Sequence, residues 1–189
     1  MISLQREPSN VFVWENREYG FHPYFNRVLT VILEVLPDTL LDDAEKVGLT
    51  IRAFSEDAPI EAGVFEGMIH ELFPRRDRKN EKKLIDFEQD AGLIYAAFLQ
   101  TYDIDLYKQR NQMDWRIFQA LLQAIPENTE LSRVISLRAQ KLPKKTKHNA
   151  DYVDSLARAK RAVALKEPEA DKKKRLAEAW KRVAESWVR

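Results

Sequence analysis

The sequence contains no cysteine among its 189 residues, so disulfide bonds and thiolate metal sites are excluded. Only five glycines occur, and they form neither a Walker-type loop nor a G-x-G-x-x-G motif. The G-x-S-x-G motif of serine hydrolases is also absent. No apolar run approaches the ~20 residues that a membrane-spanning helix needs, and the N-terminus lacks a basic-then-apolar signal pattern. We therefore expect a soluble, intracellular protein that is not an enzyme.

Candidates for metal or acid–base chemistry are correspondingly few. The three histidines are far apart in sequence and form no His-x-x-x-His pair, so surface or structural roles are favoured. Asp86, Asp90, Asp103 and Asp105 form a local carboxylate group that could in principle bind a divalent cation. A loop of alternating oxygen donors with a turn glycine is missing, however, which favours capping and solvation instead. We predict no catalytic residue, no metal site and no cofactor.

Charge is distributed unevenly, although the net charge is only +1. Residues 1–137 hold 15 basic and 23 acidic side chains, a net charge of −8, whereas residues 138–189 hold 16 and 7, a net charge of +9. These two parts should attract each other, or neighbours in a multimer, and salt should weaken the attraction. The charge run from Pro74 to Lys83 has no interleaved aromatic residues, so a solvated loop is favoured over a phosphate-binding segment.

A short β-prone start precedes a long series of helical patterns. Val11–Trp14 and Glu18–Phe21 flank a turn-like stretch and predict a hairpin, which must dock on helices because an isolated hairpin is marginal in water. Three amphipathic segments follow before the charge run. The first has Phe25, Leu29, Ile32 and Leu36 on one face, the second Leu41, Ala44, Val47, Ile51 and Phe54, and the third Val64, Met68, Ile69, Leu72 and Phe73. Asp38 or Thr39 is placed to cap the second, and two glycines weaken the prediction of a continuous third helix.

The stretch from Asp86 to Leu142 contains three more helical patterns. Asp86 and Gln89 fit a capping box that would begin the first, and Thr129 is placed to cap the third. Helices joined by such short connections should bury their apolar faces on one another. These faces hold Phe87, Ala91, Ile94, Phe98 and Tyr102, then Trp115, Phe118, Leu122 and Ile125, then Leu131, Val134 and Ile135.

The pattern D-F-x-x-D-A-x-x-I-x-A-A-F-x-x-x-Y-x-I-D-L, followed by W-x-x-F-x-x-L-L and I-x-L-R, resembles the family called bacteriophage gene product fifteen. The matching residues whose roles should be mostly structural are Asp86, Phe87, Asp90, Phe98, Tyr102, Ile104, Asp105, Leu106, Trp115 and Phe118. The other matching residues are Ala91, Ile94, Ala96, Ala97, Leu121, Leu122, Ile135, Leu137 and Arg138. Asp103 stands where that family usually has glycine, which disfavours a left-handed turn without excluding it. The resemblance extends to about Leu142 and weakens beyond it.

The resemblance implies a tail assembly chaperone of long-tailed phages and prophages of Gram-positive bacteria. Such a protein binds the tape-measure protein in the cytoplasm of the infected or lysogenic host and has no enzymatic activity. The alternative is a structural tail component, retained in the virion as a connector or a subunit of an oligomeric ring. A homo-oligomer is compatible with both functions. A nucleic-acid-binding regulator is disfavoured because the first 137 residues are acidic.

Residues 143–189 are interpreted as a basic helical C-terminal extension of a helical domain over residues 1–142, with 86–142 as its family-like core. A first helix should start at Asn149 or Asp151, and a second should follow Pro168. The candidate partner-binding residues of this last helix are Lys173, Lys174, Arg175, Leu176, Trp180, Val183 and Trp187. Ordinary packing of its tryptophan face and docking on another polypeptide are equally supported, whereas adsorption to a membrane has no further support. We therefore predict a mainly α protein, a multi-helix bundle with a small N-terminal β-hairpin and a C-terminal helical hairpin or arm.

Overall fold

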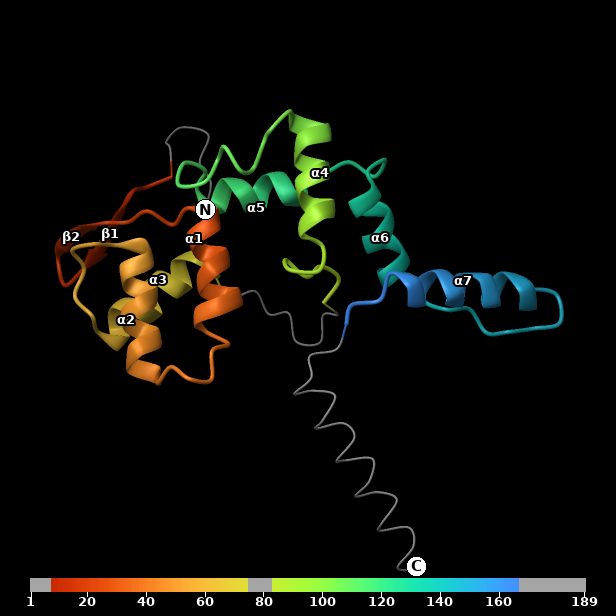
Figure 1. The fold of residues 1–189 in the computed structure, drawn as a ribbon, viewed down its shortest axis with the longest axis horizontal. Coiled ribbons are helices and arrows are strands. Elements are labelled where there is room, and N and C mark those ends of the chain that lie inside the picture. Colours follow the sequence, from red (N-terminus) through yellow and green to blue (C-terminus); the bar gives the residue numbers. More distant parts are fainter. Residues whose placement is uncertain (1–7, 75–82, 167–189) are drawn as a thin grey trace, which may run out of the picture. The chain divides into compact units, whose positions relative to one another are not determined.

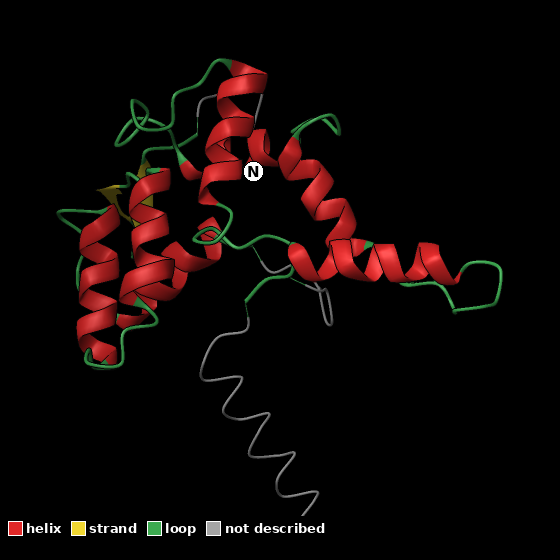
Figure 2. Ribbon diagram, turned by 45° about the vertical axis from the view of Figure 1, so that its right-hand side comes forward, coloured by secondary structure: helices red, strands yellow, loops and turns green. Residues whose placement is uncertain are grey.

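A computed structural model describes residues 8–74 and 83–166 (Figure 1). Within these ranges it contains seven α-helices, one π-helical segment and a two-stranded sheet, which confirms the predicted mainly α class with an N-terminal hairpin (Figure 2). The strands are β1 (Val11–Trp14) and β2 (Arg17–Gly20). The helices are α1 (Phe25–Thr30), η1 (Val31–Val35), α2 (Asp43–Phe54), α3 (Ala62–Leu72), α4 (Ala91–Tyr102), α5 (Trp115–Gln123), α6 (Glu130–Ala139) and α7 (Ala150–Ala162).

The chain groups into two compact units, one ending at Ile135 and one beginning at Ser136. The predicted domain boundary at residue 142 remains a prediction. The predicted terminal helix falls outside the described residues. Its partner-binding candidates are Lys173, Lys174, Arg175, Leu176, Trp180, Val183 and Trp187.

The hairpin closes through a two-residue turn. Val11 pairs with Gly20 and Trp14 with Arg17, so the second strand begins one residue earlier than predicted. Between the strands, Glu15 and Asn16 have φ angles of 47° and 61°. Two consecutive left-handed residues are the signature of a type I′ turn, whose twist matches that of the strands. Asparagine tolerates this conformation better than most residues, which explains how the turn forms without glycine.

The hairpin packs on α3 at its two glycines. The glycines weaken the helical prediction without interrupting the helix, because α3 is unbroken from Ala62 to Leu72. A Cβ atom at Gly63 would lie 2.5 Å from Cη2 of Trp14, and one at Gly67 would lie 2.9 Å from Cζ of Phe12. Both rings belong to β1. The glycines therefore lower helix propensity in exchange for a close approach of the strand.

Gly63→Ala is expected to lower the free energy of unfolding by about 1–3 kcal/mol, because Trp14 must move away from its contact with α3. This outcome opposes intrinsic propensity, since alanine is about 1 kcal/mol better than glycine inside a helix. Gly92→Ala is the matched control, because nothing lies within 4 Å of a Cβ atom built there. Urea denaturation should show that Gly92→Ala stabilises the protein by about 0.5–1 kcal/mol. Stabilisation by both substitutions would contradict the close approach.

The first helical segment buries a different face from the predicted one. Phe25 is buried as expected, but the fully buried neighbours are Val28 and Val31, whereas Leu29 is only half-buried. The segment also changes from α to π geometry at Val31, where the N–H of Leu36 donates to the Val31 carbonyl at 2.9 Å. A π turn contains one residue more than an α turn, so the side chains after it are rotated around the helix axis. A prediction based on a regular 3.6-residue repeat does not include this rotation.

Helix α2 begins later than predicted. Its cap is Asp42, whose carboxylate accepts the Glu45 N–H at 2.8 Å while the Glu45 carboxylate accepts the Asp42 N–H at 2.9 Å. This reciprocal pair is a capping box. Asp38, one of the two predicted caps, instead accepts the Leu40 N–H in the preceding turn at 2.8 Å.

The core of the first unit is organised around Phe118. Its ring stacks at centroid distances of 5.1 Å on Phe25, 5.1 Å on Phe98 and 5.5 Å on Trp115. These rings come from α1, α4 and α5, so one aromatic stack joins the three helices. The predicted core roles of the central aromatic residues are confirmed, and Thr129 caps α6 as predicted by accepting the Ser132 N–H at 3.3 Å.

Helix α4 ends in a left-handed residue despite the missing glycine. Asp103 has φ 57° and ψ 29°, its N–H donates to Leu99 at 3.0 Å, and the Ile104 N–H reaches the Phe98 carbonyl at 3.4 Å. The bond from Asp103 to Leu99 is that of the αL helix end, in which glycine is the preferred residue.

We expect Asp103→Gly to stabilise the fold by about 0.5 kcal/mol. Glycine removes the conformational energy that a Cβ atom costs in the left-handed region, and this gain exceeds the free-energy cost of the greater backbone entropy of the unfolded chain. Asp103→Ala keeps a Cβ atom and loses the tolerance of aspartate, so it should destabilise by about 1 kcal/mol. Thermal melts of both variants test the pair. A loss of stability in Asp103→Gly would show that the aspartate side chain contributes more than its backbone angles cost.

In the second unit, a lysine closes the end of α6. The ammonium group of Lys160, on α7, donates to the carbonyl oxygens of Leu137, Arg138 and Gln140. The Arg138 guanidinium donates to the Val163 carbonyl at 2.6 Å. Cations thus satisfy carbonyl groups that helix ends leave without partners.

Candidate partner-binding site

Two findings concern what the described part of the chain lacks. Among residues 8–74 and 83–166, no three His, Asp or Glu side chains gather where they could hold a metal ion. No helix in those ranges has the length and the apolar character needed to cross a bilayer.

The carboxylates near α4 organise local turns. Residues 87–90 form a turn, so α4 begins at Ala91 and not directly after Asp86 as predicted. Asp86 accepts the Gln89 N–H at 2.9 Å, and its own N–H donates to the Asp90 carboxylate at 2.9 Å. The predicted capping box therefore does not begin the helix: the N-cap of α4 is Asp90, and the contacts of Asp86 hold the turn before it. The backbone N–H of Gln89, followed by the Lys83 ammonium, lowers the pKa of Asp86.

A pocket of about 260 Å³ opens in the first unit beside the aromatic stack. Its walls come from α1, the turn before α4, α4 itself, the segment before α5, and α5. The lining residues are Phe25, Asn26, Leu29, Phe87, Ala91, Ile94, Tyr95, Leu106, Tyr107, Arg110 and Phe118. Its buried residues, Phe25, Ile94, Leu106 and Phe118, are all apolar, so a polar group entering the pocket would lose water without gaining a partner there.

The rim of this pocket is more exposed. Ala91, Tyr107 and Arg110 face solvent, and 72% of the Tyr107 surface is accessible. The Tyr107 ring lies 5.1 Å from the ring of Tyr95, which is half-buried. The carboxylate of Asp105 orders this region by accepting the Tyr107 N–H at 3.0 Å. An exposed aromatic ring beside an apolar hollow is typical of surfaces that bind other polypeptides.

A wider hollow of about 590 Å³ lies over α3 next to Trp14. Its lining residues on α3 include the two glycines, together with the exposed Glu66 and His70. Only half-buried and exposed residues line it, so it lacks the buried aromatic floor of the first pocket.

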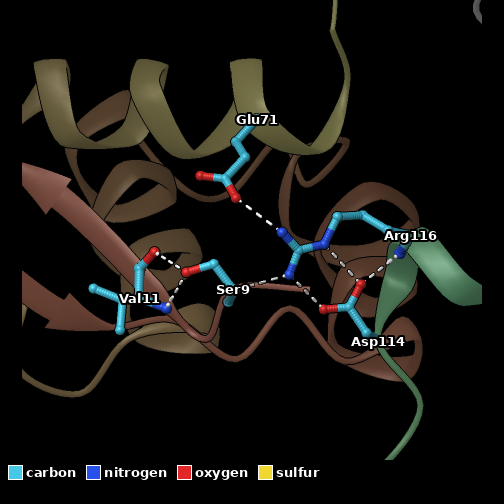
Figure 3. Close-up of polar contacts among 5 residues, drawn as sticks. All are labelled: Ser9, Val11, Glu71, Asp114 and Arg116. Carbon is cyan, nitrogen blue, oxygen red and sulfur yellow. Dashed lines mark hydrogen bonds and ion pairs between the residues drawn. The ribbon is translucent and has the colours of Figure 1, made fainter. Parts of the chain in front are cut away.

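An ionic cluster supports the start of α5 (Figure 3). Arg116 bonds Asp114 through two nitrogens at 2.9 and 2.7 Å, Glu71 at 3.0 Å and the Ser9 carbonyl at 2.9 Å. Asp114 also caps α5 by accepting the Arg116 N–H at 2.7 Å. Burial raises the pKa of Glu71, and the attraction of Arg116 only partly offsets this effect. The cluster joins the start of β1, the end of α3 and the start of α5.

The family model described as Bacteriophage Gp15 protein matches residues 9–165, which is most of the chain. The chain belongs to this family. The match confirms the resemblance, whose motifs lie in residues 86–142, and continues past Leu142, where the resemblance was expected to weaken. Neither a curated protein nor a solved structure matches the chain.

In this bacteriophage Gp15 protein, the predicted motif residues divide into three groups. Those that line the pocket are Phe87, Leu106 and Phe118. Those that form or pack against the core are Phe98, Tyr102, Ile104 and Trp115. Those whose carboxylates hold turns are Asp86, Asp90 and Asp105. The motif therefore builds a surface pocket as well as a core.

Several residues of the site gave no signal in the Gp15 sequence. Asn26 and Arg110 line the pocket but lie far apart in the chain and belong to no motif. The side chains of Asn26 and Asn111 hold α1 against the segment before α5, with Asn111 N–H donating to Asn26 Oδ1 at 2.8 Å. The role of Arg116 was also not predictable from the sequence, because a single arginine in an amphipathic helix is ordinarily a solvated side chain.

Proposed function

We propose that this bacteriophage Gp15 protein is a non-catalytic tail assembly chaperone that binds helical segments of the tape-measure protein. The observation that carries the proposal is the open apolar pocket with Phe118 at its floor and Tyr107 at its rim. Grooves of this kind receive an anchor side chain from the apolar face of an amphipathic helix. A tape-measure protein is a long helical polypeptide that presents many such faces.

The size of the pocket fits transient holding better than permanent assembly. Burying one leucine or phenylalanine side chain contributes about 1.5–3 kcal/mol, which is weak for a single contact. Many copies along one client would together shield its apolar faces from aggregation, because repeated weak contacts add through effective concentration. Each copy could still leave individually when tube subunits replace it. The proposed location of this activity is the cytoplasm of the infected or lysogenic host.

Co-expression with the adjacent tape-measure protein tests the proposal, and Ala91→Trp is the informative variant. Ala91 is exposed and lines the pocket, so an indole there should fill the pocket without disturbing the core. Ala96→Trp is the matched control on the same helix, since Ala96 is exposed but does not line the pocket. We expect wild type and Ala96→Trp to keep the client soluble, and Ala91→Trp to lose at least about 90% of that soluble fraction, as for a buried contact of about 1.5–3 kcal/mol.

Three outcomes decide the matter. A client that stays insoluble with wild-type protein contradicts the chaperone function. Equal rescue by both tryptophan variants contradicts the pocket as the binding site. Stoichiometric amounts of the protein in purified virions would favour the structural tail component, retained as a connector or ring subunit.

A further inference from the structure

On the basis of the proposed function, we infer that the pocket selects an apolar anchor accompanied by a carboxylate. The client segments that it binds are therefore amphipathic helices with Asp or Glu near the anchor residue. This assignment adds a charge requirement to the apolar one, and it depends on the rim residue Arg110.

The volume of the pocket sets the kind of anchor. An engineered apolar cavity of about 150 Å³ is large enough to bind benzene. A pocket of about 260 Å³ with Phe25 and Phe118 in its lining accommodates a phenyl ring or a branched aliphatic side chain. The buried part of its lining offers no charged group, so a charged side chain cannot itself be the anchor.

The rim supplies the second requirement. Arg110 is the only charged side chain among the pocket-lining residues, and it is exposed. No ion pair joins it to another residue of the part of the chain that the structure describes. The nearby carboxylate of Asp105 interacts with other groups instead: it lies 3.9 Å from the Lys108 ammonium and accepts a hydrogen bond from the Tyr95 hydroxyl at 3.4 Å. Within the described ranges, the rim therefore presents a cation without an ion-pair partner, which complements a carboxylate on the client.

Two small probes separate the charge requirement from the apolar one. 4-Phenylbutyrate and 4-phenylbutylamine carry the same ring and chain but opposite charges. Titration into the full-length protein should shift the methyl resonances of Leu29, Ile94 and Leu106, which line the pocket. We expect the carboxylate to bind about two- to five-fold more tightly than the amine, the preference that one exposed ion pair provides. The preference should shrink with added salt.

Three variants assign the effect. Arg110→Gln should equalise the two affinities, Arg110→Glu should favour the amine, and Ala91→Trp should abolish binding of both probes. Each site is exposed, so folding should be retained, which unchanged thermal melts of the free variants will verify.

Equal affinities in the wild type, a preference that survives Arg110→Gln, or shifts confined to other residues would each overturn the inference. Failure of both probes to shift these methyl groups at millimolar concentration would overturn it as well. None of these results touches the co-expression test, so the chaperone function can stand when the charge requirement fails. Conversely, selective probe binding without client rescue would leave the pocket chemistry in place and remove the proposed client.

Discussion

Trp115→Ala is expected to lower the free energy of unfolding by about 3–5 kcal/mol. The side chain is 1% exposed, and its ring lies 5.7 Å from Phe73, 5.8 Å from Phe87 and 5.5 Å from Phe118. Removing it opens a cavity where α5 meets the connection between α3 and α4, and the aromatic neighbours cannot close that gap without leaving the stack. A loss of this size is a large part of the stability of an ordinary domain.

Urea denaturation with two companion variants checks this prediction. Trp115→Phe should lose much less, because it keeps a ring and removes an indole N–H that has no hydrogen-bond partner in the described structure. Tyr107→Ala should change stability by less than about 0.5 kcal/mol, because that ring is mainly exposed. A cost below about 1 kcal/mol for Trp115→Ala would show that the stack is not the centre of the fold.

Arg116→Met should cost about 2–4 kcal/mol. Methionine keeps an apolar stem of similar length but leaves Asp114, Glu71 and the Ser9 carbonyl without their common donor. Because the side chains of Arg116 and Asp114 are only 10% and 12% exposed, water replaces these bonds poorly. The substitution also separates three elements at once, so the hairpin should become more accessible to protease together with the overall loss of stability.

The companion variant Glu71→Gln should behave in the opposite way. Burial raises the pKa of Glu71 in the folded state, so its ionised form is less stable there than in the unfolded chain. The stabilising contribution of Glu71 is therefore present at low pH and is lost as the pH rises through the raised pKa. At pH 7, Glu71→Gln should leave stability unchanged or slightly raise it, and the difference from wild type should vanish on acidification. A loss as large as that of Arg116→Met would contradict this balance.

The features that were predictable from the sequence are those that depend on neighbouring residues. The hairpin, the central helices and the Thr129 cap rest on local propensities, and the structure has all of them. The features that were not predictable depend on tertiary contacts or on irregular backbone geometry. The two glycines of α3 are explained by the rings of β1 that pack on them, and the π turn at Val31 displaces the side chains that follow it.

The pocket escaped prediction for the same reason. Its motif residues signalled packing, and they do pack, but α1 completes the walls from a distant position in the chain, and Arg110 belongs to no motif. A helical repeat of apolar residues predicts that one face of the helix packs on other elements, but it does not show where that packing leaves a pocket. Only the tertiary structure reveals that pocket. The C-terminal tryptophan helix remains a prediction from sequence.

Because Phe118 belongs both to the aromatic stack and to the pocket floor, the proposed client recognition and the stability of the fold depend on one side chain. A bound client should raise the melting temperature, since occupancy stabilises only the folded form. Substitutions of Phe118 that would fit the pocket to a new client are then restricted, because a change in its shape would destabilise the fold. Divergence in specificity should therefore accumulate at Ala91, Tyr107 and Arg110, which solvent already reaches.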